Sequence, residues 1–167
     1  MADELMNLDG LRAILEDLAR DVEVGYKEEL ERNGHYTTLG PDARKLINSV
    51  HTRVEVHDTV YEVKMDLEEY WKYLETGTRP HWPPLSAIQR WVEYKPVLPT
   101  PDAAGRIPSP KSLAFLIARK ISRVGTKGTH DLEKTKDAVI TAYRDKLEAA
   151  LSHDIYDYLV KVLPPQK

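Results

Sequence analysis

The sequence predicts an α+β fold, in which a small antiparallel sheet packs with a long N-terminal helix, two middle helices and a long C-terminal helix. Three observations indicate this class. Apolar residues recur at every third or fourth position near both ends, they alternate with polar residues over about 46–66, and glycine and proline cluster between 77 and 110. The 167 residues are enough for one domain, which we expect to span 1–167.

The first helix is predicted from one apolar stripe. Asn7 is a suitable N-cap, and Asn33 and Gly34 provide a stop. Ten acidic and four basic residues lie within 1–32, so its outer face is acidic, and the usual meaning of such a face is solvation. A loop and the first turn of a short helix are expected over 35–45. The stripe consists of Leu8, Leu11, Leu15, Leu18, Val22, Tyr26 and Leu30.

An antiparallel hairpin is predicted over about 46–66. Valine and threonine alternate with charged residues and histidines over 50–57, and a similar alternation returns over 60–65. His51 and His57 share one strand face, but six residues along a strand span about 20 Å, which is too far for one metal ion. No metal site is expected.

The segment 70–94 contains all three tryptophans of the chain. Gly77 is predicted to turn the backbone, because glycine reaches positive φ without steric cost. Three prolines then favour a stiff, non-helical segment over 78–85, which we call the strap. A helix is predicted over 86–95, where apolar residues return at helical spacing.

Two interpretations of the strap and its flanking aromatic residues remain open. Aromatic residues usually bury their large area within one domain, so this segment could be core with an ordinary proline loop. Alternatively, it forms a rigid structural element, which the family resemblance given below places at a subunit interface. The residues assigned to that element are Trp71, Glu75, Gly77, Thr78, Arg79, Pro80, Trp82, Pro83, Pro84 and Trp91.

The last third of the chain should be a long loop followed by two helices. A proline-rich loop is predicted over 96–110, with Ser109 as the N-cap of a helix over 111–124 and Gly125 as its stop. The final helix is predicted over 131–162, and at 1.5 Å per residue its length of roughly 45 Å exceeds the diameter of a small domain. Part of its apolar stripe is therefore expected to meet another subunit or to fold back. In the preceding helix, the residues expected to face inward are Leu113, Leu116, Ile117, Ile121 and Val124.

A basic segment runs over 106–127, where six basic residues occur without an acidic one. Three interpretations are open: it binds the phosphates of a nucleic acid, it meets the acidic N-terminal helix or the Glu68–Glu69 region of a neighbouring subunit, or it is a solvated surface. The basic face consists of Arg119, Lys120, Arg123 and Lys127.

The sequence contains none of the common motifs for catalysis or cofactor binding, so we expect no enzyme and no cofactor. The segment 125–129 superficially resembles a phosphate-binding loop, but its lysine precedes the second glycine and no strand leads into it. The chain has no cysteine, which excludes disulfides and thiolate metal sites. The acidic N-terminus lacks the apolar core of a signal peptide, and no apolar run is long enough for a bilayer, so no membrane partner is expected.

Two sequence blocks resemble one known family. The pattern Y-x-x-Y-L-E-T-G-T-R-P-H-x-P-P-x-x-x-I-x-x-W-V begins at Tyr70, and AFLIARKISRVGTKGTHDL follows from Ala114 to Leu132. Together they resemble the tail-completion, or neck, proteins of tailed double-stranded DNA bacteriophages. With the preceding β-rich segment, the resemblance covers roughly residues 45–151. The chain departs from the common pattern after Gly128 and in its longer loop over 96–110.

The resemblance implies a structural protein with a small α+β fold. Members of this family assemble as rings between the portal vertex of the capsid and the tail, so the expected partners are further copies of the chain and other phage neck, portal-adaptor or tail proteins, with DNA passing through the ring lumen. The expected location is the virion, and the host cytoplasm during assembly. An alternative function is a DNA-binding accessory protein that uses the basic segment. The family positions carried over are Glu75, Gly77, Thr78, Pro80, Pro83 and Pro84 in the strap region, and Gly125, Thr126 and Gly128 after the basic helix.

Overall fold

The computed structural model describes residues 8–35, 43–57, 60–95, 99–101 and 105–163, which form an α+β fold as the sequence predicts. Asn7 and part of the loops predicted over 35–45 and 96–110 lie outside these residues. In chain order the elements are α1 (Asp9–Arg32), α2 (Lys45–Ser49), β1 (His51–His57), β2 (Val60–Asp66), α3 (Trp71–Thr76), β3 (Gly77–Thr78), α4 (Leu85–Tyr94), α5 (Pro110–Val124), β4 (Thr126–Lys127) and α6 (Asp131–Val162).

The chain divides into two compact units, which are described separately. The first contains residues 1–29, 50–66 and 132–167, and the second contains residues 30–49 and 67–131. The expectation of a single domain over 1–167 therefore stays a prediction.

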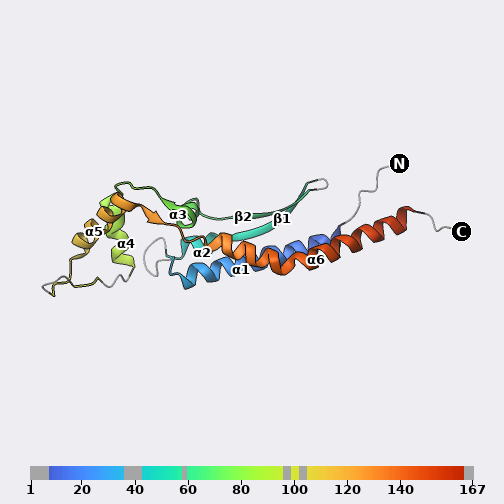
Figure 1. The fold of residues 1–167 in the computed structure, drawn as a ribbon, viewed down its shortest axis with the longest axis horizontal. Coiled ribbons are helices and arrows are strands. Elements are labelled where there is room, and N and C mark those ends of the chain that lie inside the picture. The colour runs from blue at the N-terminus through green and yellow to red at the C-terminus, as the bar shows by residue number, and fades with distance from the viewer. Residues whose placement is uncertain (1–7, 36–42, 58–59, 96–98, 102–104, 164–167) are drawn as a thin grey trace. The chain divides into compact units, whose positions relative to one another are not determined.

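The first unit is built on the pairing of α1 with α6, which run side by side with the β1–β2 hairpin next to them (Figure 1). Leu18 and Val22 of α1 and Tyr143 of α6 form its buried core. The hydroxyl of Tyr143 donates a hydrogen bond of 2.6 Å to the carboxylate of Asp21, and this bond raises the pKa of Tyr143. Partly buried apolar residues pack around this core: Ile14, Met65, Leu132, Val139 and Leu147.

A second contact fixes the start of α1 against α6. Asp154 is buried on α6, and its carboxylate accepts a 2.8 Å hydrogen bond from the backbone N–H of Leu11. This N–H belongs to the first turn of α1, where backbone donors have no partner within the helix. A Cβ on Gly10 would lie 2.7 Å from Oδ1 of Asp154, so the absence of a side chain there allows the contact.

The hairpin pairs β1 with β2 in an antiparallel register that places Val54 opposite Val63. It is attached to α1 through Thr52. The backbone N–H of Thr52 donates to Glu23 over 2.7 Å, and its hydroxyl donates to the carbonyl of Ala19 over 2.9 Å. The predicted alternation is incomplete, because Val56 near the hairpin tip and Val63 in the middle of β2 are exposed.

The predicted start of the hairpin at residue 46 is wrong. Residues 45–49 form the short helix α2, and β1 begins only at His51. Leu46 and Ile47 are both buried although they are adjacent in the sequence, which a half-buried strand does not allow. Periodicity over so few residues cannot separate a short helix from a strand.

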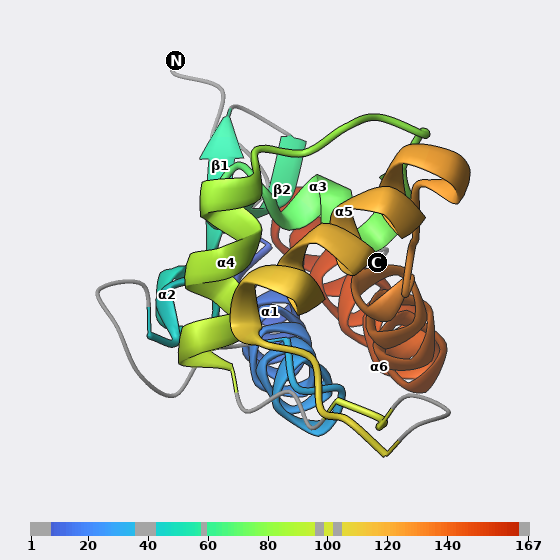
Figure 2. The same ribbon diagram turned by 90° about the vertical axis from the view of Figure 1, so that its left-hand side faces the viewer.

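The second unit contains the helix pair α4 and α5, which lie side by side (Figure 2). As predicted, the chain is non-helical from Thr78 to Pro84, and α4 begins one residue earlier than expected. The side chain of Ser109 accepts a hydrogen bond from the backbone N–H of Ser112, so the predicted N-cap of α5 is confirmed. Gly125 ends this helix at φ 71°, also as predicted.

The predicted inward face of α5 is partly wrong. Leu116 and Val124 are exposed, whereas Ala114 and Ala118 are the buried residues of the helix. Two alanines four positions apart lie on one helix face, and their small side chains allow a neighbouring segment to approach closely. The prediction was based on large apolar residues, and it therefore missed a buried face formed by alanines.

The contact between Asp154 and α1 yields a stability prediction. Replacing Asp154 with alanine should reduce the free energy of unfolding by about 1 kcal/mol, because a first-turn N–H loses its acceptor. The matched control is Asp157→Ala, which removes an exposed carboxylate one helical turn away and should change stability by less than about 0.5 kcal/mol. Urea unfolding followed by circular dichroism measures both. Equal effects of the two changes would show that Asp154 does not cap α1.

Candidate subunit interface

The two sequence blocks that resemble the phage family contact each other in the second unit. β3 pairs with β4 in a two-stranded antiparallel sheet, with Gly77 opposite Lys127 and Thr78 opposite Thr126. The hydroxyls of Thr78 and Thr126 lie 2.9 Å apart, and the backbone N–H of Thr126 donates to the Thr78 hydroxyl over 3.2 Å. We call the paired segments 75–78 and 125–130 the clasp.

Three glycines make the clasp possible. A Cβ on Gly77 would lie 2.2 Å from the carbonyl oxygen of Thr126, and one on Gly125 would lie 2.0 Å from that of Thr78. A Cβ on Gly128 would lie 2.1 Å from the carbonyl oxygen of Glu75. Distances below 3 Å to backbone atoms leave no room for a side chain. Gly77 and Gly125 also have positive φ values of 74° and 71°, which other residues adopt at a cost.

Backbone bonds extend the clasp to the start of α6. The N–H of Thr129 donates to the carbonyl of Leu74 over 2.9 Å, and that of His130 donates to the carbonyl of Glu75 over 3.3 Å. Asp131, the first residue of α6, is buried and lies 3.4 Å from the imidazole of His35. Burial lowers the pKa of His35, while the charge of Asp131 opposes the shift. Neither this buried pair nor the pairing of the two blocks is predicted from the sequence, because the partners lie far apart along the chain.

The residues assigned to the structural element differ in burial. Glu75 and Gly77, which belong to the clasp, are buried, as is Pro83 in the strap. The side chains around Pro83 face solvent, and Trp82 is 51% exposed. Trp71 and Thr78 are half-buried, and the remaining members are exposed: Arg79, Pro80, Pro84 and Trp91. The clasp thus fixes one end of the strap, while most strap side chains remain at the surface.

An apolar surface continues from the strap onto α5. The rings of Trp82 and Phe115 meet edge to face, with their centroids 5.8 Å apart. Phe115 is itself exposed, as are Leu85 on α4 and Leu116 on α5. Exposed apolar residues in contact with one another are unusual on a monomer and often mark an interaction site.

The predicted basic face lies on α5 and at the adjoining end of the clasp. Arg119, Lys120 and Arg123 line an open hollow of about 330 Å³ together with Leu116 and Val124. Lys127 lies in β4 and is also exposed. Within the described part of the chain, none of these four cations forms an ion pair. The face therefore has both charge and apolar area available to a partner.

The acidic face of α1, in contrast, is partly neutralised within its own helix. Arg12 pairs with Glu16 over 2.9 Å and Arg20 pairs with Asp17 over 2.8 Å. A third pair joins Lys27 to Glu23 over 2.7 Å. Such surface pairs contribute little to stability, but each reduces the negative charge that α1 offers to a partner.

The end of α6 carries a second exposed apolar surface, in the first unit. α1 begins opposite Asp154, and the apolar residues from Leu151 to Leu163, just past the end of α6, are exposed except Tyr158, which is half-buried. Helices that are apolar on several faces are usually buried. The exposed residues are Leu151, Ile155, Tyr156, Leu159, Val160, Val162 and Leu163.

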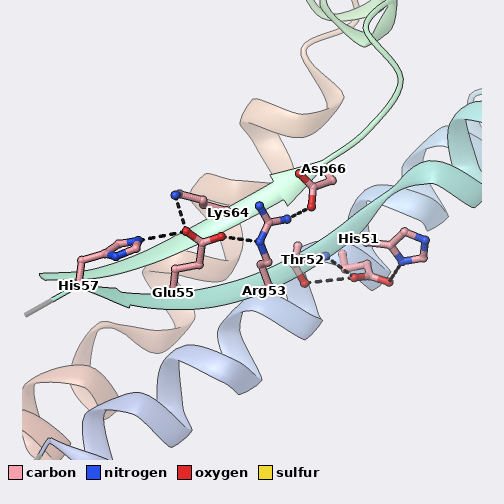
Figure 3. Close-up of polar contacts among 8 residues, drawn as sticks. His51, Thr52, Arg53, Glu55, His57, Lys64 and Asp66 are labelled. Carbon is pink, nitrogen blue, oxygen red and sulfur yellow. Dashed lines mark hydrogen bonds and ion pairs between the residues drawn. The ribbon is translucent and has the colours of Figure 1, made fainter.

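The outer face of the hairpin carries a polar network (Figure 3). Glu55 accepts hydrogen bonds from Lys64 and Arg53, and these bonds lower the pKa of Glu55 to about 2. Ligand atoms of Glu55, His57 and Glu62 lie within 4.8 Å of one another, a grouping that could hold a metal ion. Because Lys64 and Arg53 already balance the charge of Glu55, we assign no metal to this cluster.

Comparison with known proteins identifies no family: no family model, curated protein or solved structure matches the chain. The phage family expected from the two blocks therefore stays a prediction. None of the helices in the described residues combines the length and apolar character needed to span a bilayer.

The clasp yields a prediction about glycine. Gly125→Ala should lower the free energy of unfolding by roughly 3 kcal/mol or more, because backbone strain adds to a clash with the carbonyl of Thr78. Gly34→Ala is the matched control: Gly34 has φ 64° but nothing within 4 Å of its Cβ position, so only the strain of about 1 kcal/mol should remain. Thermal unfolding compares the two variants. Equal losses of stability would mean that the close approach in the clasp is unimportant.

Proposed function

We propose that this chain is a structural virion protein of a tailed phage, which forms a ring in the neck or tail-completion layer between portal and tail. The observation that carries the proposal is the clasp, which joins the two sequence blocks of the family resemblance through backbone pairing. Residues about fifty positions apart in the sequence pair with each other in the clasp. The glycines of both blocks lie at this contact. A shared local structure explains why these motifs would occur together.

The exposed apolar surfaces support assembly. In the second unit, the rings of Trp82 and Phe115 contact each other and are both exposed to solvent. In the first unit, the end of α6 exposes a further apolar surface. Burial of such apolar surface against a partner lowers the free energy of the complex. In a ring, the partner of each surface is a neighbouring copy or an adjacent neck, portal-adaptor or tail protein.

The mechanism is geometric rather than catalytic. The clasp anchors the strap at Gly77, three prolines restrict its backbone, and the exposed strap residues meet the adjacent subunit. The basic face of α5 then sets the position of that neighbour by charge. A head-to-tail contact repeated by rotation generates a closed ring.

The strap interface predicts the behaviour of Trp82→Ala. The variant should fold, because Trp82 is half exposed and contacts Phe115 only at the ring edge, but it should no longer assemble. Tyr73→Ala is the matched control, since Tyr73 is 55% exposed on α3 outside the strap and should assemble normally. Light scattering measures the mass, and circular dichroism checks the fold. If the Trp82→Ala variant still assembled, the strap would not be part of the subunit interface.

A second candidate function, a DNA-binding accessory protein, is favoured by the basic face. Arg119 and Arg123 are exposed on one side of α5 without an ion-pair partner among the described residues, as phosphate-binding side chains require. In a neck ring, the same face could line the lumen through which DNA passes.

This candidate predicts salt-dependent binding to DNA. Arg119→Glu with Arg123→Glu should abolish the affinity for a DNA duplex, and the parent affinity should fall steeply as salt rises. The control variant, Arg144→Glu with Lys161→Glu, changes net charge equally on exposed positions of α6 and should retain most of the affinity. Fluorescence anisotropy measures both. If the unmodified protein did not bind DNA, or bound it with an affinity that does not depend on salt, this candidate function would be wrong.

A further inference from the structure

The two edges of the β1–β2 hairpin are not equivalent. Because the N–H of Thr52 donates to Glu23, it points away from β2, and the opposed residues Thr52 and Met65 form a non-hydrogen-bonded pair. Such pairs alternate along an antiparallel ladder. The backbone groups of Tyr61, Val63 and Met65 therefore point to the outer edge of β2.

The outer edge of β1 is occupied by its own unit. Glu23 bonds the backbone and the hydroxyl of Thr52, and Ala19 accepts from the same hydroxyl. On β2, no hydrogen bond from any described residue outside the hairpin reaches the backbone of Tyr61, Val63 or Met65. A free edge of this kind can pair with another strand.

Directly opposed positions of the hairpin carry like charges, although Lys64 pairs with Glu62 of its own strand over 3.3 Å. The register places Glu55 directly opposite Glu62, and Arg53 directly opposite Lys64. Like charges at directly opposed positions destabilise a strand pair. The side chains compensate through a diagonal bond from Lys64 to Glu55 and a bond from Arg53 to Glu55 on the same strand (Figure 3).

The same charges match when β2 pairs with a copy of itself. The strand reads V-Y-E-V-K-M-D, and an antiparallel pairing centred on Val63 places Glu62 opposite Lys64 of the second copy. Val63 then meets Val63, and Tyr61 meets Met65. The free backbone groups belong to residues 61, 63 and 65, which become hydrogen-bonded pairs in this register. Glu62 and Lys64 occupy the closer, non-hydrogen-bonded positions, which suit an ion pair.

We propose that the outer edge of β2 is a docking site for β2 of a second copy of this chain, related by a two-fold axis through Val63. The contact joins two hairpins into a four-stranded sheet, which is more stable than an isolated hairpin. It also shields Val63, which is 39% exposed in the single chain. A two-fold contact cannot by itself close a ring. This interface is therefore distinct from the strap, and it does not depend on the proposed phage function.

Single cysteines test the position of the axis, because the chain contains no cysteine of its own. Opposed Cα atoms in a hydrogen-bonded pair are about 5.5 Å apart, within the span of a disulfide. Under mild oxidation, Val63→Cys should form a covalent dimer. Glu62→Cys should form one only when mixed with Lys64→Cys. Failure of Val63→Cys to link, or efficient linking of Val54→Cys on β1 instead, would overturn the proposal.

Charge exchange tests the register by sedimentation. Glu62→Lys and Lys64→Glu should each weaken dimer formation roughly tenfold, because both ion pairs across the axis become like-charged. The double exchange should restore the dimer. Within the hairpin, each single exchange places an opposite charge across from Glu55 or Arg53, so the hairpin should still form, which circular dichroism checks. Dimer formation that is unaffected by the single exchanges, or not restored by the double one, would contradict this register.

Discussion

The second unit depends on the close backbone contact between β3 and β4. Gly77, Gly125 and Gly128 each bring a Cα within reach of a carbonyl oxygen that would clash with a side chain. The contact determines where α3 ends, where α5 ends and how the chain enters α6. The proposal for the strap depends on this constraint, because the clasp holds the start of the rigid proline segment and so fixes where its side chains are presented.

Charge is distributed unequally between the two faces that the sequence suggested as partners. Three acidic residues of α1, Glu16, Asp17 and Glu23, form pairs within their own helix, whereas the basic face has no ion pair among the described residues. Opposite charges alone would therefore provide only part of the proposed subunit contact. The exposed apolar side chains of Trp82, Phe115 and Leu116 lie in the same unit as the basic face. They would supply apolar surface for a partner to bury, in addition to the charge.

Local signals predicted much of the fold. The bounds of α6, the cap at Ser109 and the stop at Gly125 were all predicted, because each depends on residues near in sequence. α2 was missed, since five residues carry too little periodicity, and the buried Ala114 and Ala118 were overlooked in favour of larger residues. The clasp could not be predicted from the sequence. Its glycines are required by close contact with backbone atoms about fifty positions away. The same limit applies to the free edge of β2, which depends on the bond between Thr52 and Glu23.

The central claim is that this chain assembles with copies of itself into a ring. The most direct test is the mass of the purified protein by light scattering over a range of concentrations, together with electron microscope images of the largest species. The account predicts closed rings of uniform size, formed by the chain alone or on a purified portal complex. A protein that remains a monomer or a simple dimer at all concentrations, and that does not bind the portal complex, would contradict the account.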